Sequence, residues 1–69
     1  MRFTIEVLRS FHENAAVLAR ERVFAIWPIG AKRKAFTLLE QWQGRGATAV
    51  RVLDSSGKEI YFMTSASDR

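Results

Sequence analysis

The sequence predicts a small α+β domain, in which a four-stranded, mostly antiparallel sheet carries two helices on one face. Three observations predict this class. Apolar and polar residues alternate over 2–9, apolar residues recur at helical spacing over 31–43, and two strand-like runs flank a turn at 55–57. The expected order is β-α-β-α-β-β. The chain has 69 residues, so we expect a single domain at 1–64 and a flexible tail at 65–69.

Residues 2–9 are predicted to form the first strand. Phe3, Ile5 and Val7 fall on one face of this strand, and the residues between them fall on the other. This alternation is typical of a strand with one buried face.

The segment 11–21 has two interpretations. Ser10 and Glu13 have the spacing of a capping box, and the residues that follow are mostly good helix formers. We therefore predict a helix. In the alternative, the segment joins residues 22–27 in one long strand that pairs with the first strand, and the order becomes β-β-α-β-β. The pattern alone leaves both interpretations open.

Residues 22–27 (RVFAIW) are mostly β-branched or aromatic, which favours a buried strand. Pro28 ends this strand, because proline has no N–H to donate to a neighbouring strand. Trp27 is expected to pack in the core at the end of the strand.

The strongest periodic pattern in the chain predicts a helix at about 31–43. Its apolar stripe is expected to face the core and consists of Ala31, Ala35, Leu38, Leu39 and Trp42. Gly44 and Gly46 close the helix, because glycine readily adopts the left-handed conformation of a helix cap.

Residues 47–64 are predicted to form a hairpin with Gly57 in the left-handed conformation. The expected register pairs Asp54 with Lys58, Val52 with Ile60, and Val50 with Phe62. On the outer face of the sheet, it places Arg51 opposite Tyr61, with Leu53 and Met63 nearby.

The composition limits the function classes. The chain has no cysteine and one histidine, His12, so we expect no disulfide, metal or cofactor site. No nucleophile–base pair or phosphate-binding loop is present in the sequence, so we expect no enzyme activity. The longest uncharged run, residues 23–31, is shorter than the ~20 residues of a membrane-spanning helix. No apolar stretch of signal-peptide length begins the sequence, so we expect a cytoplasmic protein without a membrane partner.

Three cations lie at the predicted start of the second helix, where the helix dipole disfavours them. Lys32, Arg33 and Lys34 would stand beside free backbone N–H groups that attract phosphate. The net charge of +4 agrees with a polyanionic partner. The sequence therefore predicts a small basic nucleic-acid-binding or regulatory protein, with further binding residues at Arg45, Arg51 and Tyr61.

The outer face of the predicted sheet offers a second hypothesis from a different class. An uncovered apolar face usually marks an interface. This face would serve a protein-interaction module, an inhibitor or a homo-oligomer, and its residues are Leu8, Ala49, Leu53, Tyr61 and Met63.

The segment RVFAIWPIGAKRKAFTLLEQWQGRGATAVRV, residues 22–52, also resembles half of a SPOR domain. The similar features are a strand that ends in Trp27-Pro28-Ile29, a basic residue, Ala35 with the leucines, and Gly46 before a further strand. The resemblance implies an α/β module that binds peptidoglycan.

Overall fold

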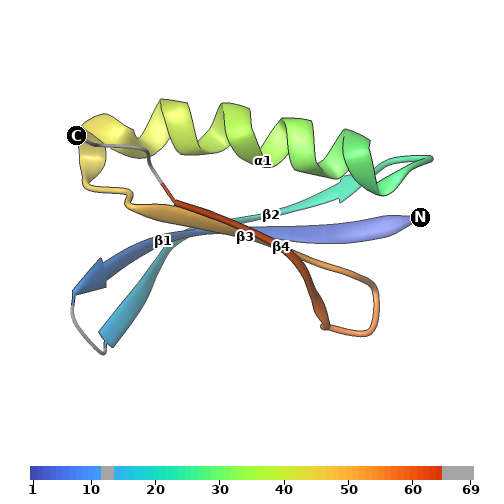
Figure 1. The fold of residues 1–69 in the computed structure, drawn as a ribbon, viewed down its shortest axis with the longest axis horizontal. Helices are drawn as coiled ribbons and strands as arrows, with labels where there is room; N and C mark the ends of the chain where they lie inside the picture. Colours follow the sequence, from blue (N-terminus) through green and yellow to red (C-terminus); the bar gives the residue numbers. More distant parts are fainter. Residues whose placement is uncertain (12–13, 65–69) are drawn as a thin grey trace.

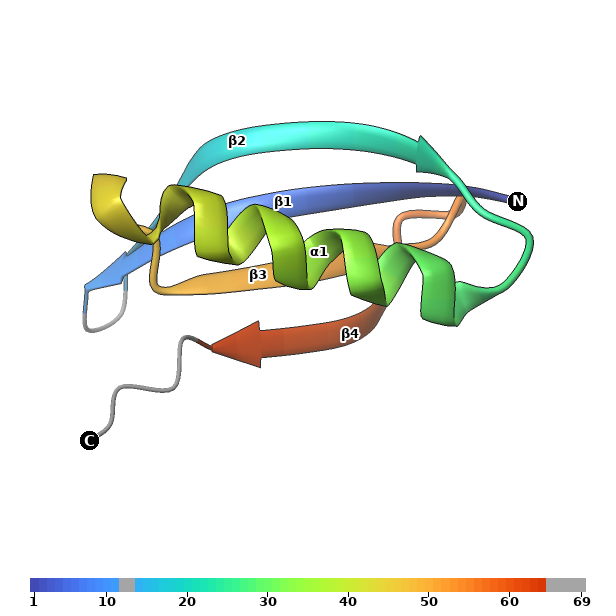
Figure 2. The same cartoon turned by 90° about the horizontal axis from the view of Figure 1, so that it is seen from above.

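The computed structural model describes residues 1–11 and 14–64, which form one sheet and one α-helix. Along the chain, the elements are β1 (Arg2–Phe11), β2 (Asn14–Phe24), α1 (Pro28–Trp42), a 3₁₀ turn (Gln43–Arg45), β3 (Ala49–Leu53) and β4 (Glu59–Thr64). The four strands are ordered β2-β1-β3-β4, and every neighbouring pair is antiparallel. Helix α1 lies across one face of the sheet, and no other helix or strand of the described residues covers the opposite face (Figure 1; Figure 2).

The predicted α+β class and four-stranded antiparallel sheet are confirmed, but the prediction of two helices is wrong. Phe11 and residues 14–21 are strand, so the alternative order β-β-α-β-β is the one observed. β1 is an inner strand, paired with β3 on one edge and with β2 on the other. A helix over 11–21 would leave one edge of β1 without partners from Ile5 to Phe11, so sheet pairing overrides the helix propensity of these residues. Glu13, His12 and the predicted tail at 65–69 lie outside the described residues.

Helix α1 begins at Pro28, about one turn earlier than predicted, and the strand before it ends at Phe24. Proline suits the first position of a helix, because its fixed backbone angle is helical and its missing N–H is not needed there. The N–H of Gly30 donates to the carbonyl oxygen of Trp27 at 3.0 Å and closes the first turn. Trp27, predicted in the core, therefore lies in the β2–α1 connection and is 69% exposed.

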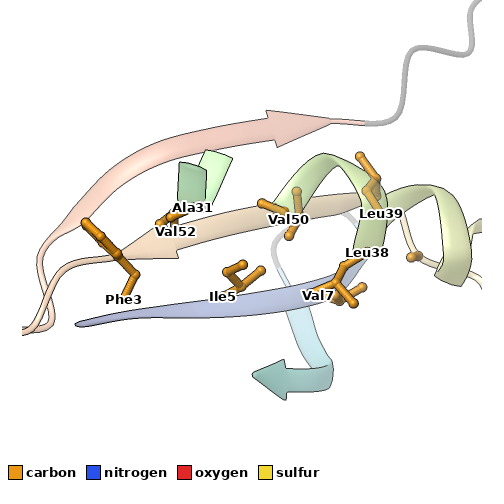
Figure 3. Packing of buried hydrophobic residues seen from close by; sticks show 10 residues of the cluster. Phe3, Ile5, Val7, Ala31, Leu38, Leu39, Val50 and Val52 are labelled. Carbon is orange, nitrogen blue, oxygen red and sulfur yellow. The ribbon is translucent and has the colours of Figure 1, made fainter. Parts of the chain in front are cut away.

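The core lies between α1 and the covered face of the sheet (Figure 3). The sheet contributes Phe3, Ile5 and Val7 from β1 and Val50 and Val52 from β3, all of them buried. The helix contributes the predicted stripe, because Ala31, Ala35, Leu38 and Leu39 are buried. The small side chains of the two alanines let the helix axis approach the strands closely. Trp42 is half-buried and packs at the margin of this core.

The turn between β3 and β4 forms as predicted, but the predicted register of the hairpin is wrong beyond the first pairs. The N–H of Asp54 donates to the carbonyl oxygen of Lys58 at 2.8 Å, and Leu53 stands opposite Glu59. Ile60 is then an extra residue in a bulge, so Val52 pairs with Tyr61 instead of Ile60. As a consequence, Val50 pairs with Met63 and Arg51 with Phe62.

The bulge exchanges the two faces of β4. Tyr61 and Met63 turn toward α1 and pack against the core, whereas the sequence predicted both on the outer face. Phe62 takes the outer position opposite Arg51. A bulge shifts every residue beyond it by one position, and one position reverses the side to which a strand residue points.

Gly57→Ala is expected to lower the free energy of unfolding by about 1–2 kcal/mol, because its φ of 88° is left-handed and costs an L side chain this much. Steric contact adds nothing, since no heavy atom lies within 4 Å of an added Cβ. Gly44→Ala is the matched control: it has equal space but no positive φ, and we expect no loss of stability. Thermal unfolding followed by circular dichroism measures both changes, and equal effects would rule out backbone strain at Gly57.

Candidate functional site

The three cations predicted as a binding cluster on α1 have different surroundings in the structure. The ammonium group of Lys32 lies 5.2 Å from the centre of the Tyr61 ring, and that of Lys34 lies 3.7 Å from a carboxylate oxygen of Glu21. Arg33 is exposed. Because the helix begins at Pro28, these cations lie beyond its first turn, where the helix dipole has little effect. The premise that the three cations stand at a helix start is therefore wrong.

The other predicted binding residues are divided between the two faces of the sheet. Arg45 lies at the far end of α1, with its guanidinium 5.3 Å from the centre of the Trp42 ring. Tyr61 faces the helix, whereas Arg51 points to the uncovered face. Of this predicted set, only Arg51 lies on the uncovered face.

The predicted apolar interface is not one surface either. Leu8 and Ala49 do lie on the uncovered face, but both are buried, and Leu53 is half-buried. Tyr61 and Met63 face α1 because of the bulge in β4. The uncovered face is therefore less apolar than the sequence predicted.

Strand pairing arranges the residues of this uncovered face in rows that cross the sheet. We call it the open sheet face. Its rows, read from β2 to β4, are Val17–Leu8–Ala49–Thr64, Arg20–Glu6–Arg51–Phe62 and Arg22–Thr4–Leu53–Glu59, followed by the pair Phe24–Arg2. Residues two apart on a strand point to the same side, so every member follows from the register. Four arginines stand here against two glutamates.

Glu6 is at the centre of the face and is bound by an arginine on each side. The Nε of Arg20 donates to Oε2 of Glu6 at 2.8 Å, and the Nε of Arg51 donates to Oε1 at 2.5 Å. Each arginine adds a contact from its second nitrogen. Glu6 is only 3% exposed, so burial raises its pKa. The hydrogen bonds from both arginines outweigh burial, and the pKa lies below its ordinary value.

Arg2 and Arg22 border an open hollow of about 330 Å³ at one end of the face. Within the described part of the chain, neither guanidinium forms an ion pair or a side-chain hydrogen bond. Asp54 also lines this hollow, but its Oδ1 accepts hydrogen bonds from the Ser56 hydroxyl and from the N–H groups of Ser56 and Lys58. These bonds lower the pKa of Asp54. The hollow thus offers two unpaired cations to an anion.

Two exposed aromatic side chains stand beside arginines on the same face. Phe62 is 53% exposed and lies opposite Arg51, and Phe24 is 76% exposed and lies opposite Arg2. Directly opposite residues on neighbouring antiparallel strands have Cβ atoms about 4.5–5.5 Å apart. Each ring therefore stands within side-chain reach of a guanidinium group.

The sequence prediction missed most of the charged and aromatic residues that form this site, namely Arg2, Glu6, Arg20, Arg22, Phe24 and Phe62. The missed signal is the run Arg20-Glu21-Arg22. In one strand, the two arginines share a face, but the sequence prediction placed Arg20 in the helix over 11–21 and Arg22 in the strand over 22–27, so no shared face was expected. Phe62 was missed because the bulge at Ile60 leaves no local pattern in the sequence.

No protein-family model, curated protein or solved structure matches this chain. The resemblance of residues 22–52 to a SPOR domain thus has no support from these comparisons, and glycan binding is not carried further. Among the described residues, no helix is long and apolar enough to cross a membrane.

Proposed function

We propose that this protein binds single-stranded nucleic acid through its open sheet face, without catalysing a reaction. The proposal depends on one observation: the same two residue types, phenylalanine and arginine, lie side by side at two places on this face. An exposed phenylalanine stands opposite an arginine twice, Phe62 beside Arg51 and Phe24 beside Arg2. Aromatic rings stack on bases while cations contact phosphates, and single-strand binding surfaces combine these two interactions.

The proposal keeps the partner class that the sequence predicted and changes the site. The basic residues of α1 diverge, and two of them already interact with Tyr61 or Glu21. On the open sheet face, Arg2 and Arg22 border one hollow and make no such contact with the described residues. The net charge of +4 supports a polyanionic partner on either face.

A single strand suits this face better than a duplex. The bases of a single strand can turn their faces onto Phe62 and Phe24, whereas the bases of a duplex are already stacked on one another. We therefore expect weaker binding of a duplex, through phosphate contacts alone. We also propose that this protein is located in the cytoplasm.

The double variant Arg2→Ala/Arg22→Ala is expected to weaken binding of every single-stranded sequence. If each arginine contacts one phosphate, the slope of log K against log salt should become less negative by about 1.4 units, since each contact contributes about 0.7 for single strands. Fluorescence anisotropy with labelled oligonucleotides, DNA and RNA of one sequence, measures this at several salt concentrations. Arg33→Ala, an exposed arginine on α1, is the control and should leave the slope nearly unchanged.

Phe62→Ala separates base stacking from charge. Stacking on an aromatic ring contributes about 1–3 kcal/mol per base, so we expect single strands to bind roughly 5- to 150-fold more weakly. Phe36→Ala is a matched control, because Phe36 has nearly the same exposure, 55%, but lies on α1. The salt slope should stay the same in both variants, because neither changes a charge.

Two results would overturn the proposal. One is a parent protein that binds no single strand at low salt. The other is a triple variant, Lys32→Ala/Arg33→Ala/Lys34→Ala, that abolishes binding while the arginine and phenylalanine variants of the sheet bind normally. The second result would show that the nucleic-acid-binding site lies on α1.

A further inference from the structure

The hollow at the end of the open sheet face is bordered by three parts of the chain. Its lining comes from the start of β1, from the end of β2 and from the β3–β4 turn. Figure 1 shows this turn on the side of the sheet away from α1, near the end where the N-terminus lies. The volume of about 330 Å³ is near the lower end of the range for small-ligand sites, about 300–1,000 Å³. The hollow therefore suits one small chemical group.

Four side chains in the lining can donate hydrogen bonds, and none of them has a side-chain partner among the described residues. They are the guanidinium groups of Arg2 and Arg22 and the hydroxyl groups of Thr4 and Ser55. Arg2 and Arg22 are diagonal neighbours on paired strands, with Cα atoms about 7–8 Å apart. Both side chains are long enough to bring their guanidinium groups to one anion between them.

Asp54 is the one acidic residue in the lining, and its charge opposes the binding of an anion. Its Oδ1 already accepts hydrogen bonds from the Ser56 hydroxyl and from the N–H groups of Ser56 and Lys58, which partly neutralise the carboxylate. The lining still carries the positive charges of two arginines against this single negative charge. An anion with two charges therefore gains more in the hollow than an anion with one.

The phosphate at the end of a nucleic-acid strand differs from an internal phosphate in charge and in free oxygens. A terminal phosphate is a monoester, which carries a charge of about −1.5 to −2 at pH 7 and has three strong acceptor oxygens. An internal phosphate is a diester with a single charge. The monoester can therefore accept hydrogen bonds from both guanidinium groups and from a hydroxyl group at the same time.

The hollow lies where the open sheet face ends. Arg2 begins β1, Phe24 ends β2, and these two residues are paired. A second hollow of about 400 Å³ borders Phe24 and shares Arg2 and Arg22 with the first. A single strand that crosses the face from Phe62 reaches the limit of the sheet here. Its last base can stack on Phe24 while its terminal phosphate enters the first hollow.

We propose that this hollow binds the terminal phosphate of a single strand in preference to an internal phosphate. The inference rests on the proposed function, because it assigns one part of the same face to the end of the strand. An internal stretch of the strand can place a separate phosphate at each arginine, whereas a terminal phosphate contacts both. The monoester is a 5′-phosphate or a 3′-phosphate, and the experiment distinguishes them.

Fluorescence anisotropy with one single-stranded sequence in three forms tests the inference. The strand carries a 5′-phosphate, a 3′-phosphate or neither, and the label is attached at the end without phosphate. We expect the parent to bind at least one phosphorylated form about 10-fold more tightly than the unphosphorylated form, as for one additional hydrogen bond between charged groups. The preferred end gives the direction in which the strand crosses the sheet.

Variants test whether the preference arises in the hollow. Arg22→Ala and Ser55→Ala should each reduce the preference, and Arg2→Ala/Arg22→Ala should abolish it. Ser55 is exposed in the turn, so its substitution leaves the core intact. Phe62→Ala should weaken the binding of all three forms by the same factor and keep their ratio. Arg33→Ala, the arginine control on α1, should keep both the affinities and the ratio.

The pH dependence of the preference identifies the charge of the monoester. Its second proton dissociates with a pKa of about 6, whereas a diester has no such step. The charged groups in the lining are Arg2, Arg22 and Asp54. All three keep their charge between pH 7.5 and pH 5, since hydrogen bonds, first of all from Ser56, lower the pKa of Asp54. We therefore expect the preference for the phosphorylated form to decrease as the pH falls through this range.

The outcomes separate this inference from the proposed function. If the parent binds all three forms equally, the inference is overturned and the proposed function still stands. A preference that is unchanged in Arg2→Ala/Arg22→Ala, or unchanged between pH 7.5 and pH 5, would also overturn the inference. A parent that binds none of the forms at low salt overturns the proposed function and the inference together.

Discussion

Phe3→Ala is expected to lower the free energy of unfolding by about 3–5 kcal/mol, a large part of the total. Phe3 is 2% exposed and is the largest of the fully buried side chains in the core between β1 and α1. Truncation of a core phenylalanine costs about 3–5 kcal/mol through lost burial and the cavity left behind. A domain of this length has a total stability of about 3.5–10 kcal/mol, at roughly 0.05–0.15 kcal/mol per residue. Urea unfolding followed by circular dichroism should show a midpoint far below that of the parent, with no folded baseline if the parent's stability lies at the low end of this range.

Phe36→Ala provides the matched control for this prediction. The change of residue type is the same, but Phe36 is 55% exposed on α1, so the free energy of unfolding should change by less than about 0.5–1 kcal/mol. If both variants unfold at the same urea concentration as the parent, Phe3 is not in the core and the packing of β1 against α1 is wrong.

Glu6→Gln is expected to lower stability and to strengthen nucleic-acid binding. The substitution keeps the shape of the side chain but removes the charge that accepts hydrogen bonds from Arg20 and Arg51. Hydrogen bonds to charged groups contribute about 1.5–3 kcal/mol. We expect a loss near the lower end, about 2 kcal/mol, because both arginines reach solvent and can be hydrated again. Urea unfolding measures the loss.

The same substitution releases two arginines on the open sheet face. With Glu6 neutral, both guanidinium groups can contact phosphates, so single strands should bind more tightly and with a steeper salt dependence. Glu40→Gln, an exposed residue on α1, makes the same chemical change away from the face and should alter neither stability nor binding. A Glu6→Gln variant that binds like the parent would exclude Arg20 and Arg51 from the binding surface.

The dependence of stability on pH checks the Glu6 ion pairs separately. The pKa of Glu6 is lower in the folded chain than in the unfolded chain, because Arg20 and Arg51 donate hydrogen bonds to the carboxylate and outweigh the effect of burial. Its contribution is therefore fully present above the unfolded pKa and is lost as the pH falls through the folded pKa. Between pH 6 and pH 3, the parent should lose more stability than Glu6→Gln. Parallel curves would show that Glu6 is not stabilised as a carboxylate.

Local features of the sequence were sufficient to predict α1 and the β3–β4 turn. The stripe of Ala31, Ala35, Leu38 and Leu39 is buried as expected, because helical spacing alone determines which residues share a face. Gly57 is left-handed as expected, because few other residues adopt this conformation without strain. Both predictions depend on residues within about a turn of each other, and in this structure no distant contact overrides them.

The residues of the open sheet face come together only through contacts between distant segments, and the sequence prediction placed few of them on one surface. Arg20 and Arg22 share a face only because residues 14–24 pair with β1, although their helix propensity favours the other structure. Arg51 was predicted as a binding residue and does lie on this face, but its partner Glu6 is 45 residues away in the sequence.

The sequence by itself determined the α+β class, the apolar face of α1 and the β3–β4 turn, because periodicity and turn chemistry are local properties. Only the tertiary structure decided whether residues 14–21 are strand, where α1 begins and which side chains of β4 face the helix. The physical reason is that an inner strand needs hydrogen-bonding partners on both edges, and a single bulge reverses the faces of the strand beyond it. Neither the pairing of an inner strand nor the position of a bulge can be recognised from a short stretch of sequence.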